Sequence, residues 1–228
     1  MIKVVPAIIE NTRKDIIGEV SLVKSFVDTV QIDIMDGIFT HTKSWPFTSD
    51  NARDELEILK NTNIKLIDGN TLFELDLMVD RPEYFLDLFL GTGASALIFH
   101  IDSTSDMDAL IEKTKKWGVR VAIAIRPYTS LDLLLPYLDR IDFVQCMGSD
   151  KIGYHGVKLD GSVYERITRL REVYPDGIIG VDIGVDEETA PRLVKAGANK
   201  LVAGSAIFDS DDMEDSIRYF SNLGNNES

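Results

Sequence analysis

Cysteine and positive charge are both scarce in this sequence. Cys146 is the one cysteine among 228 residues, so an intramolecular disulfide is excluded and a reducing compartment fits. We expect Cys146 to be a small buried hydrophobic residue. Lys and Arg number 24 against 38 Asp and Glu, which gives a net charge of −14. Nucleic acid and anionic membranes are bound through clustered Lys and Arg, so neither is an expected partner.

Long apolar runs and linker-like stretches are also missing. No segment approaches the roughly 18 uninterrupted apolar residues of a membrane span. The opening MIKVVPAIIENTRKD has no signal-peptide pattern, so we expect a cytoplasmic protein. No Ser- or Pro-rich linker divides the chain. We therefore expect one domain over residues 1–228, with a frayed polar tail at 224–228.

What the sequence does contain is a regular alternation of short apolar runs and longer amphipathic segments. The runs predict strands, because they are rich in Val and Ile and are bounded by Gly, Pro, Asn or Asp. The segments between them repeat apolar residues every three or four positions, which predicts helices. The expected strands are Lys3–Ile9, Thr29–Met35, Phe73–Val79, Ala96–Ile101, Arg120–Ile125, Asp142–Met147, Ile178–Ile183 and Lys200–Ala206. The expected helices are Arg13–Val27, Asn51–Leu59, Pro82–Leu90, Asp108–Trp117, Leu131–Leu138, Val163–Val173, Glu187–Ala196 and Met213–Leu223.

Strict alternation of strands and helices favours a parallel sheet with crossover helices. Eight such units in a chain of this length predict a single (β/α)₈ TIM barrel. The main rival is a doubly wound open sheet. That fold usually has fewer strands at this length, and the sequence after the first strand, IIENTR, is not a glycine-rich dinucleotide turn.

Polar residues recur on one face of several expected strands. Side chains alternate along a strand, so Gln31, Asp33 and Met35 share a face, as do Asp76 and Met78. The apolar faces of the strands are needed against the helices. The opposite faces, with these polar residues and Asp182, are therefore expected to point into the barrel. Buried carboxylates are costly without partners, so this pattern predicts a bound cation, shared protons or a buried water network. The alternative is a set of unrelated carboxylates, each satisfied by Lys, Arg or backbone N–H groups.

Two long connections stand out. Gly37–Asp50 follows the second strand and carries His41, and on the catalytic side of a barrel we interpret it as a substrate-covering loop. Asn61–Leu72 enters a strand from the opposite side, so its expected role is structural. His100 is either a substrate contact or a satisfied core histidine. His155 either approaches the phosphate or, as we expect, is a solvent-exposed loop residue.

Several segments together resemble the ribulose-phosphate 3-epimerase family. The segments are QIDIMDGIF (31–39), ELDLMVDRP (74–82), GVDIGV (180–185) and LVAGSAIF (201–208), with weaker matches at PAII, FHID and GYHGVKLD. The resemblance implies an enzyme of carbohydrate metabolism whose substrate is a small phosphorylated sugar of the pentose phosphate type. By analogy with that family alone, the protein is also expected to form a homo-oligomer.

The resemblance also implies roles for individual residues. The acid–base pair maps to Asp33 and Asp182, which lie on opposite faces of the substrate. The methionines that frame the enediolate map to Met35, Met78 and Met147, and the phosphate site maps to Gly156, Gly184, Gly204 and Ser205. The family holds a metal with two His and two Asp, whereas this chain has Gln31 and Asp76 where the two His are expected. The first Gly of the VDGGV pattern is Ile183 here.

These departures leave the cofactor open. The candidate ligands Gln31, Asp33, Asp76 and Asp182 are all oxygen donors, which favours Mg²⁺ or Mn²⁺ over Zn²⁺. The alternative is a metal-free site, with Asp76 protonated or hydrogen-bonded to Gln31. The leading prediction is an isomerase that epimerises C3 of a ketose phosphate through an enediolate. A lyase or decarboxylase on the same scaffold and a non-catalytic sugar-phosphate-binding protein are the alternatives.

Overall fold

Eight strands and their helices make up the computed structural model, which describes residues 2–48, 56–59, 65–67, 69–154 and 156–225. The strands follow one another in chain order around a closed barrel, and the pairs with a determined register run parallel. The predicted (β/α)₈ fold is therefore confirmed. The strands are β1 Lys3–Ile8, β2 Thr29–Met35, β3 Leu72–Met78, β4 Ala96–His100, β5 Arg120–Ile125, β6 Phe143–Met147, β7 Ile178–Asp182 and β8 Lys200–Ala203.

The helices lie between these strands in the chain. The α-helices are α1 Arg13–Val23, α3 Leu86–Leu90, α4 Met107–Lys116, α5 Ser162–Val173, α6 Ala190–Ala196, α7 Ser205–Phe208 and α8 Met213–Asn222. The 3₁₀ helices are η1 Pro82–Tyr84, η2 Leu131–Leu133, η3 Leu135–Arg140 and η4 Leu223–Asn225. Among the described residues, no helix combines the length and the apolar character that a membrane crossing needs.

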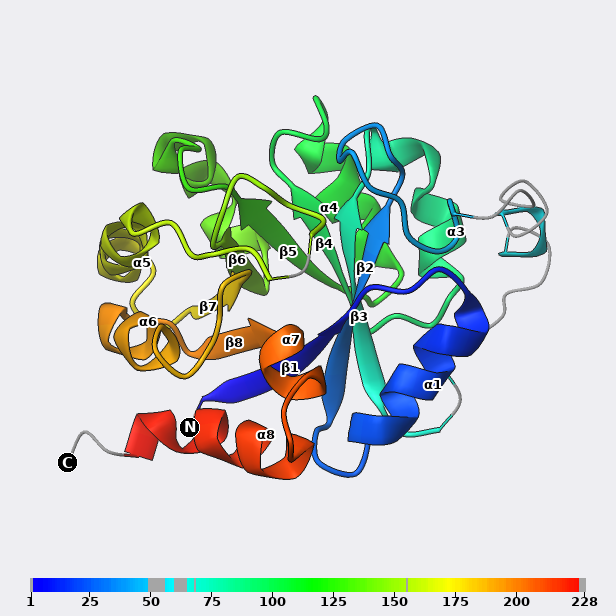
Figure 1. Cartoon of the computed structure of the whole chain (residues 1–228). Coiled ribbons are helices and arrows are strands. Elements are labelled where there is room, and N and C mark those ends of the chain that lie inside the picture. The colour runs from blue at the N-terminus through cyan, green and yellow to red at the C-terminus, as the bar shows by residue number, and fades with distance from the viewer. Residues whose placement is uncertain (1, 49–55, 60–64, 68, 155, 226–228) are drawn as a thin grey trace. The chain divides into compact units, whose positions relative to one another are not determined.

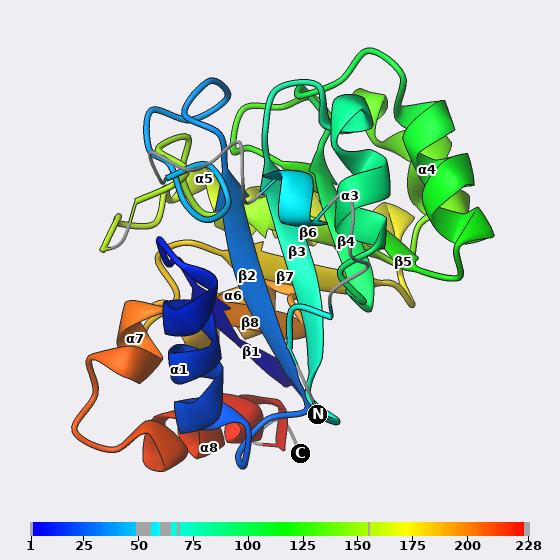
Figure 2. The ribbon, with the colours of Figure 1, turned by 90° about the vertical axis from the view of Figure 1, so that its right-hand side faces the viewer.

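The chain divides into two compact units. Ala7–Ala122 is called here the Asp33 unit, and Met1–Pro6 with Ile123–Ser228 is called the Asp182 unit. In the Asp33 unit, β2 and β3 lie side by side with α1, α3 and α4 around them (Figures 1 and 2). In the Asp182 unit, β6, β7 and β8 are accompanied by α5 and α6 (Figure 1).

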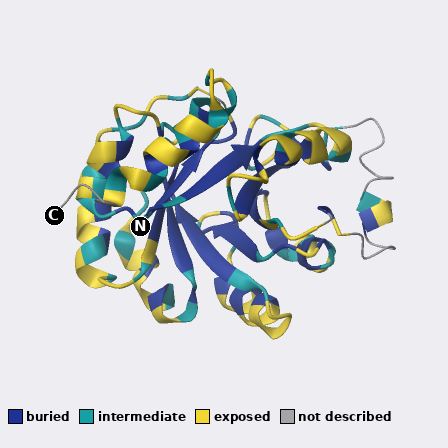
Figure 3. Ribbon diagram, turned by 90° about the horizontal axis from the view of Figure 1, so that it is seen from below, coloured by how far each residue is buried: buried dark blue, intermediate teal, exposed yellow. Residues whose placement is uncertain are grey.

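Burial follows the expected pattern, with buried strands and helices that expose one side (Figure 3). Helix α4 shows why. Its buried residues are Met107, Leu110, Ile111 and Thr114, which are spaced by three, one and three positions and so form one stripe along the helix. The Asp106 side chain accepts a hydrogen bond from the backbone N–H of Ala109 at 3.1 Å, as expected of an N-cap.

Most strand boundaries agree with the expected ones to within a residue, and the main exception is β8. We expected a strand over Lys200–Ala206, but β8 ends at Ala203 and α7 begins at Ser205. Gly204 lies between them with φ −97° and ψ −91°, a backbone conformation outside both the helical and strand regions. This glycine turns the chain and brings Ser205 to the start of a short helix.

The helices differ more from the expected ones. The segment Leu131–Leu138 forms η2 and η3 instead of an α-helix, because Pro136 lacks the N–H that an α-helical turn there needs. The helix expected from Glu187 begins at Ala190, after a turn in which Asp186 accepts hydrogen bonds from the N–H groups of Glu188 and Thr189. The helix expected over Arg13–Val27 ends at Val23.

Parts of three further predictions lie outside the described residues. One is residues 51–55 of the helix expected over Asn51–Leu59, of which residues 56–59 are described and helical. Another is residues 61–64 and 68 of the connection before β3. In the expected frayed tail, Gly224 and Asn225 belong to η4, and residues 226–228 are outside the described chain.

Candidate active site

Asp33 lies in β2, two residues before the strand ends. Its side chain is almost completely buried, with 5% of the residue exposed, and Gln31 on the same strand face is fully buried. The amide Nε2 of Gln31 donates a hydrogen bond to Oδ1 of Asp33 at 2.8 Å. Residues two apart on a strand point to the same side, so this contact follows from the alternation that the sequence predicts.

Asp76 occupies the matching place on β3, directly opposite Asp33 in the strand register. Its Oδ1 lies 3.0 Å from Nε2 of His100, the last residue of β4, and neither side chain is exposed. The amide of Gln31 therefore donates to Asp33, and the imidazole of His100 lies beside Asp76. The metal-free alternative, with Asp76 protonated or hydrogen-bonded to Gln31, stays a prediction. Nε2 of the buried His100 therefore has a carboxylate partner, and the substrate contact considered for this residue stays a prediction.

The second nitrogen of the His100 imidazole, Nδ1, differs from Nε2 in its hydrogen bonding. Nδ1 of His100 is buried and has no hydrogen-bond partner within the part of the chain that the structure describes. The ring packs edge-on against Phe39, with ring centroids 5.2 Å apart. Phe39 lies in the loop that follows β2, so this loop covers part of the imidazole.

One carboxylate, that of Asp36, fixes the beginning of this loop. Its Oδ1 accepts hydrogen bonds from the backbone N–H groups of Ile38 and Phe39 at 2.8 and 2.9 Å. Its Oδ2 accepts another from the N–H of Asp80 at 2.8 Å, just after β3. Our sequence analysis gave Asp36 no role. The signal was an Asp-Gly pair immediately after a strand, where an Asp side chain commonly bonds the backbone of the next residues.

The rest of the described loop packs against the end of β2. Ser44 donates a hydrogen bond to the carbonyl oxygen of Asp33 at 2.6 Å and accepts one from the N–H of Met35 at 2.9 Å. Trp45 is 2% exposed, whereas His41 is exposed. The interpretation of Gly37–Asp50 as a substrate-covering loop stays a prediction, and its residues 49 and 50 lie outside the described chain.

Three methionines are buried where the family resemblance places its methionine ring. Met35 and Met78 end β2 and β3 and stand opposite each other in the register. Met147 ends β6, and each of the three residues is 1% exposed. Thr42 contacts the sulfur of Met35 through its hydroxyl at 3.2 Å.

In the Asp182 unit, Asp182 is the last residue of β7 and is 5% exposed. Its two carboxylate oxygens receive hydrogen bonds from different elements. The backbone N–H of Ile183 donates to Oδ1 at 2.7 Å, and Nε2 of Gln145 on β6 donates to Oδ2 at 3.3 Å. Gln145 is fully buried, and our sequence analysis gave it no role.

The two residues after Asp182 both have a left-handed backbone, with φ 76° at Ile183 and φ 70° at Gly184. A positive φ is a true outlier for a β-branched residue, and such strain costs about 1–3 kcal/mol. At Gly184 the conformation is unstrained, but a Cβ there would lie 2.6 Å from the backbone nitrogen of Leu159. A side chain at position 184 is therefore excluded twice, by φ and by space.

The predicted phosphate residues all lie in the Asp182 unit. The register pairs Asp182 with Val202, and Gly184 and Gly204 each follow that pair by two residues. Gly184, Gly204 and Ser205 are half-buried, whereas Gly156 is exposed with φ 66°. His155, beside Gly156, lies outside the described residues. The assignment of these residues to a phosphate site stays a prediction.

Asp33, Asp76 and Asp182 are three buried carboxylates of a kind that could hold a metal ion. Asp33 and Asp76 each have one oxygen beside a nitrogen neighbour, from Gln31 and His100, and both oxygens of Asp182 accept hydrogen bonds, from Ile183 and Gln145. Carboxylate oxygens are hard donors, which suit Mg²⁺ or Mn²⁺ better than Zn²⁺. The donor set of this chain therefore fits a divalent cation of the oxygen-preferring kind.

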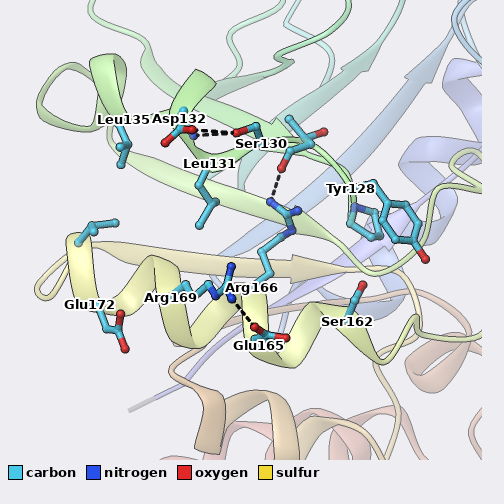
Figure 4. A pocket seen from close by; sticks show the side chains of 13 residues that line it. Tyr128, Ser130, Leu131, Asp132, Leu135, Ser162, Glu165, Arg166, Arg169 and Glu172 are labelled. Carbon is cyan, nitrogen blue, oxygen red and sulfur yellow. Dashed lines mark hydrogen bonds and ion pairs between the residues drawn. The ribbon is translucent and has the colours of Figure 1, made fainter.

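A separate pocket of about 650 Å³ lies on the outside of the Asp182 unit, between α5 and the segment that follows β5 (Figure 4). Arg166 crosses it to donate to the carbonyl oxygen of Thr129, and Glu165 pairs with Arg169 at 2.6 Å. Burial lowers the pKa of Arg166. None of the residues predicted for the active site lines this pocket.

The fold and the residues together define a class, the (β/α)₈-barrel proteins with buried carboxylates near the C-terminal ends of their strands. The chain belongs to the ribulose-phosphate 3-epimerase family, whose model matches residues 3–208. It is 30% identical over 210 residues to the ribulose-phosphate 3-epimerase of Eremothecium gossypii, covering 87% of this chain and 82% of that one. It is also 30% identical over 224 residues to that of Bacillus subtilis, covering 95% and 97%.

Solved structures show the same fold at lower sequence identity. A 3-hexulose-6-phosphate synthase from Salmonella typhimurium aligns with a TM-score of 0.67 and 19% identity over 97% of each chain. A mutant tryptophan synthase α-subunit from Pyrococcus furiosus aligns with a TM-score of 0.66 and 17% identity, over 98% of this chain and 97% of that one. At these identities the likeness extends to the fold alone.

Proposed function

We propose that this protein epimerises C3 of a ketose phosphate of the D-ribulose 5-phosphate type. The observation that carries the proposal is the presence of two buried, hydrogen-bonded aspartates, Asp33 and Asp182, at strand ends in a chain of this family. The curated relatives named above are ribulose-phosphate 3-epimerases, which supports the same substrate class.

The chemistry needs a base on each face of C3. The carboxylate of one aspartate removes the C3 proton, and the electrons of the broken C–H bond form the C2–C3 enediolate. The other aspartate, in its protonated form, returns a proton to the opposite face. Substrate and product then differ only in configuration at C3, and the next turnover in the same direction requires the two carboxyl groups to exchange protons with solvent.

The enediolate oxygen also needs stabilisation. We propose that Gln31, Asp33, Asp76 and Asp182 bind a divalent cation, with Mg²⁺ or Mn²⁺ favoured over Zn²⁺. When bound, such a cation supplies Lewis-acid stabilisation of charge on the substrate oxygens. In a metal-free site, a protonated Asp76 would donate to the enediolate instead, and the contact with His100 would fix its orientation.

We also propose residues for substrate binding. Backbone N–H groups at Gly184, Gly204 and Ser205, with Gly156 from the loop after β6, would bind the phosphate without requiring net positive charge. Met35, Met78 and Met147 would enclose the apolar carbon chain. This arrangement is compatible with the net charge of −14, because none of these residues is cationic.

The direct test is solvent exchange. The protein is mixed with D-ribulose 5-phosphate in deuterated water, alone and with Mg²⁺, Mn²⁺ or Zn²⁺, and deuterium at C3 and the epimeric product are followed by NMR. Asp33→Asn and Asp182→Asn are each expected to lower the epimerisation rate by about 10² to 10⁴. Absence of exchange with every ketose phosphate and metal would exclude the proposal.

One observation favours a second candidate, a non-catalytic sugar-phosphate-binding protein. Both positions at which the family resemblance places metal-binding histidines hold other residues, Gln31 and Asp76. Tight phosphate-ester binding without exchange, and unchanged affinity in Asp33→Asn, would support this candidate over the enzyme.

A further inference from the structure

Both aspartates proposed to transfer protons receive a hydrogen bond from a buried primary amide. Gln31 donates to Asp33 at 2.8 Å from two residues away on the same strand. Gln145 donates to Asp182 at 3.3 Å from the neighbouring strand, β6. Neither glutamine is exposed to solvent. The NH₂ group of a buried amide needs an acceptor, and a carboxylate oxygen supplies one.

We propose that Gln145 is a positioning residue, which sets the orientation of the Asp182 carboxylate for proton transfer. This inference rests on the proposed function. The inference extends that function by giving a role to a side chain that neither the sequence pattern nor the family resemblance singled out.

The geometry around Asp182 shows what Gln145 adds. The N–H of Ile183 donates to Oδ1 at 2.7 Å, but it belongs to the adjacent residue and contacts one oxygen alone. Nε2 of Gln145 reaches the other oxygen, Oδ2, from a different strand. Two donors at opposite ends of one carboxylate set both its position and its plane.

Gln145 also links this carboxylate to another residue of the proposed site. The same Nε2 lies 4.0 Å from the sulfur of Met147, at the end of β6. The register pairs Met147 with Asp182 across β6 and β7, so the amide lies between these two side chains on one strand pair. A proton-transfer group misaligned by about 1 Å loses about 10²-fold in rate, so a fixed plane matters.

The test uses the fact that, in a two-base epimerase, deuterium exchange into each C3 epimer reports on one of the two bases. Each C3 epimer loses its proton to a different aspartate, so solvent deuterium enters D-ribulose 5-phosphate through one base and D-xylulose 5-phosphate through the other. Both exchange rates are measured by NMR for the wild-type chain and for Gln145→Leu. In this variant an apolar side chain of similar size replaces the amide donor. Gln145→Met is the second variant, in case the first does not fold.

The matched control is Cys146→Ala. Cys146 is the next residue on β6, is fully buried, and points to the other side of the strand. Loss of the Gln145 amide is expected to change the ratio of the two exchange rates by about tenfold, because only the Asp182 face is affected. A merely structural role predicts that both rates fall by the same factor, as expected for Cys146→Ala, and that result would overturn the proposal.

A second readout does not depend on turnover. In protein labelled with [¹⁵N]glutamine, the side-chain NH₂ of Gln145 is assigned from its disappearance in Gln145→Leu. Its proton is expected to move upfield and to exchange faster in Asp182→Ala. Wild-type protein that exchanges neither sugar would refute the proposed function. An amide signal that does not respond to Asp182→Ala would refute the positioning role, whether or not the chain is active.

Discussion

Nε2 of His100 lies 3.0 Å from Oδ1 of Asp76, and both side chains are fully buried. Removing one partner of a buried pair that contains a carboxylate is strongly destabilising, because the remaining group was desolvated on folding. We expect His100→Phe to lower the free energy of unfolding by about 3 kcal/mol. Urea denaturation followed by tryptophan fluorescence measures the change.

The double variant separates this contact from simple loss of packing. In Asp76→Asn the carboxylate is absent, so His100→Phe is expected to cost less in that background, with a coupling of about 1 kcal/mol or more. Costs that simply add in the double variant would show that the imidazole and the carboxylate do not interact.

Ile183 has a φ of 76°, in a region that suits glycine. In Ile183→Gly the relief of about 1–3 kcal/mol of backbone strain opposes about 1 kcal/mol of extra chain entropy in the unfolded state. We therefore expect this variant to be as stable as the wild type or up to about 2 kcal/mol more stable, as measured by its thermal midpoint.

Ile178 provides the control for this substitution, because it begins β7, the strand that Ile183 follows, is exposed and has no positive φ. Ile178→Gly should destabilise the protein by about 1 kcal/mol. Equal destabilisation at positions 178 and 183 would show that the left-handed backbone at Ile183 stores no strain.

Cys146 should be chemically inert in the folded protein. Complete burial raises the pKa of its thiol from about 9 to about 12, so little thiolate forms between pH 7 and 9. Reaction with a thiol reagent at pH 8 should proceed no faster than unfolding. In a Cys146→Ala chain, an exposed thiol added by Ser105→Cys should react rapidly under the same conditions.

The same shift makes stability depend on pH at the alkaline end. The unfolded chain loses the thiol proton near pH 9, whereas the folded chain retains it until about pH 12. In this window unfolding releases a proton, so stability falls as pH rises, by at most about 1.4 kcal/mol per unit from this group. Cys146→Ala should remove this part of the slope, and an unchanged slope would contradict the assignment.

Gly184 should tolerate no side chain. In Gly184→Ala the new Cβ would lie 2.6 Å from the nitrogen of Leu159, and φ is 70°. We expect a loss of about 2 kcal/mol or more in stability, together with weaker binding of a phosphate ester measured by calorimetry. Gly18→Ala in α1 is the control, because no atom beyond the adjacent residues and the backbone of its own helix lies within 4 Å of the added Cβ. This variant should be more stable by about 0.5–1 kcal/mol.

The sequence predicted the strands well because their apolar runs are short and bounded by turn residues. β2 and β5 begin and end at the predicted residues. The helical segments were harder to delimit, since an apolar repeat cannot show whether each turn has its hydrogen bonds. Leu131–Leu138 has the spacing of an α-helix, but Pro136 makes it two 3₁₀ helices.

The buried polar side chains of the site were predicted from strand alternation, but their partners were not. Gln31 contacts Asp33 because both lie on one strand, a relation that the sequence contains. The contacts of His100 with Asp76 and of Gln145 with Asp182 join neighbouring strands. Such contacts depend on the register between strands, and a single sequence does not specify that register.

The three hydrogen bonds of Asp36 have a mechanical consequence. One carboxylate connects the start of the loop after β2, at Ile38 and Phe39, to the start of the loop after β3, at Asp80. Displacement of either segment therefore pulls on the other or breaks a charge-assisted bond. The chain segments that leave two neighbouring strands are thus mechanically coupled through a single side chain.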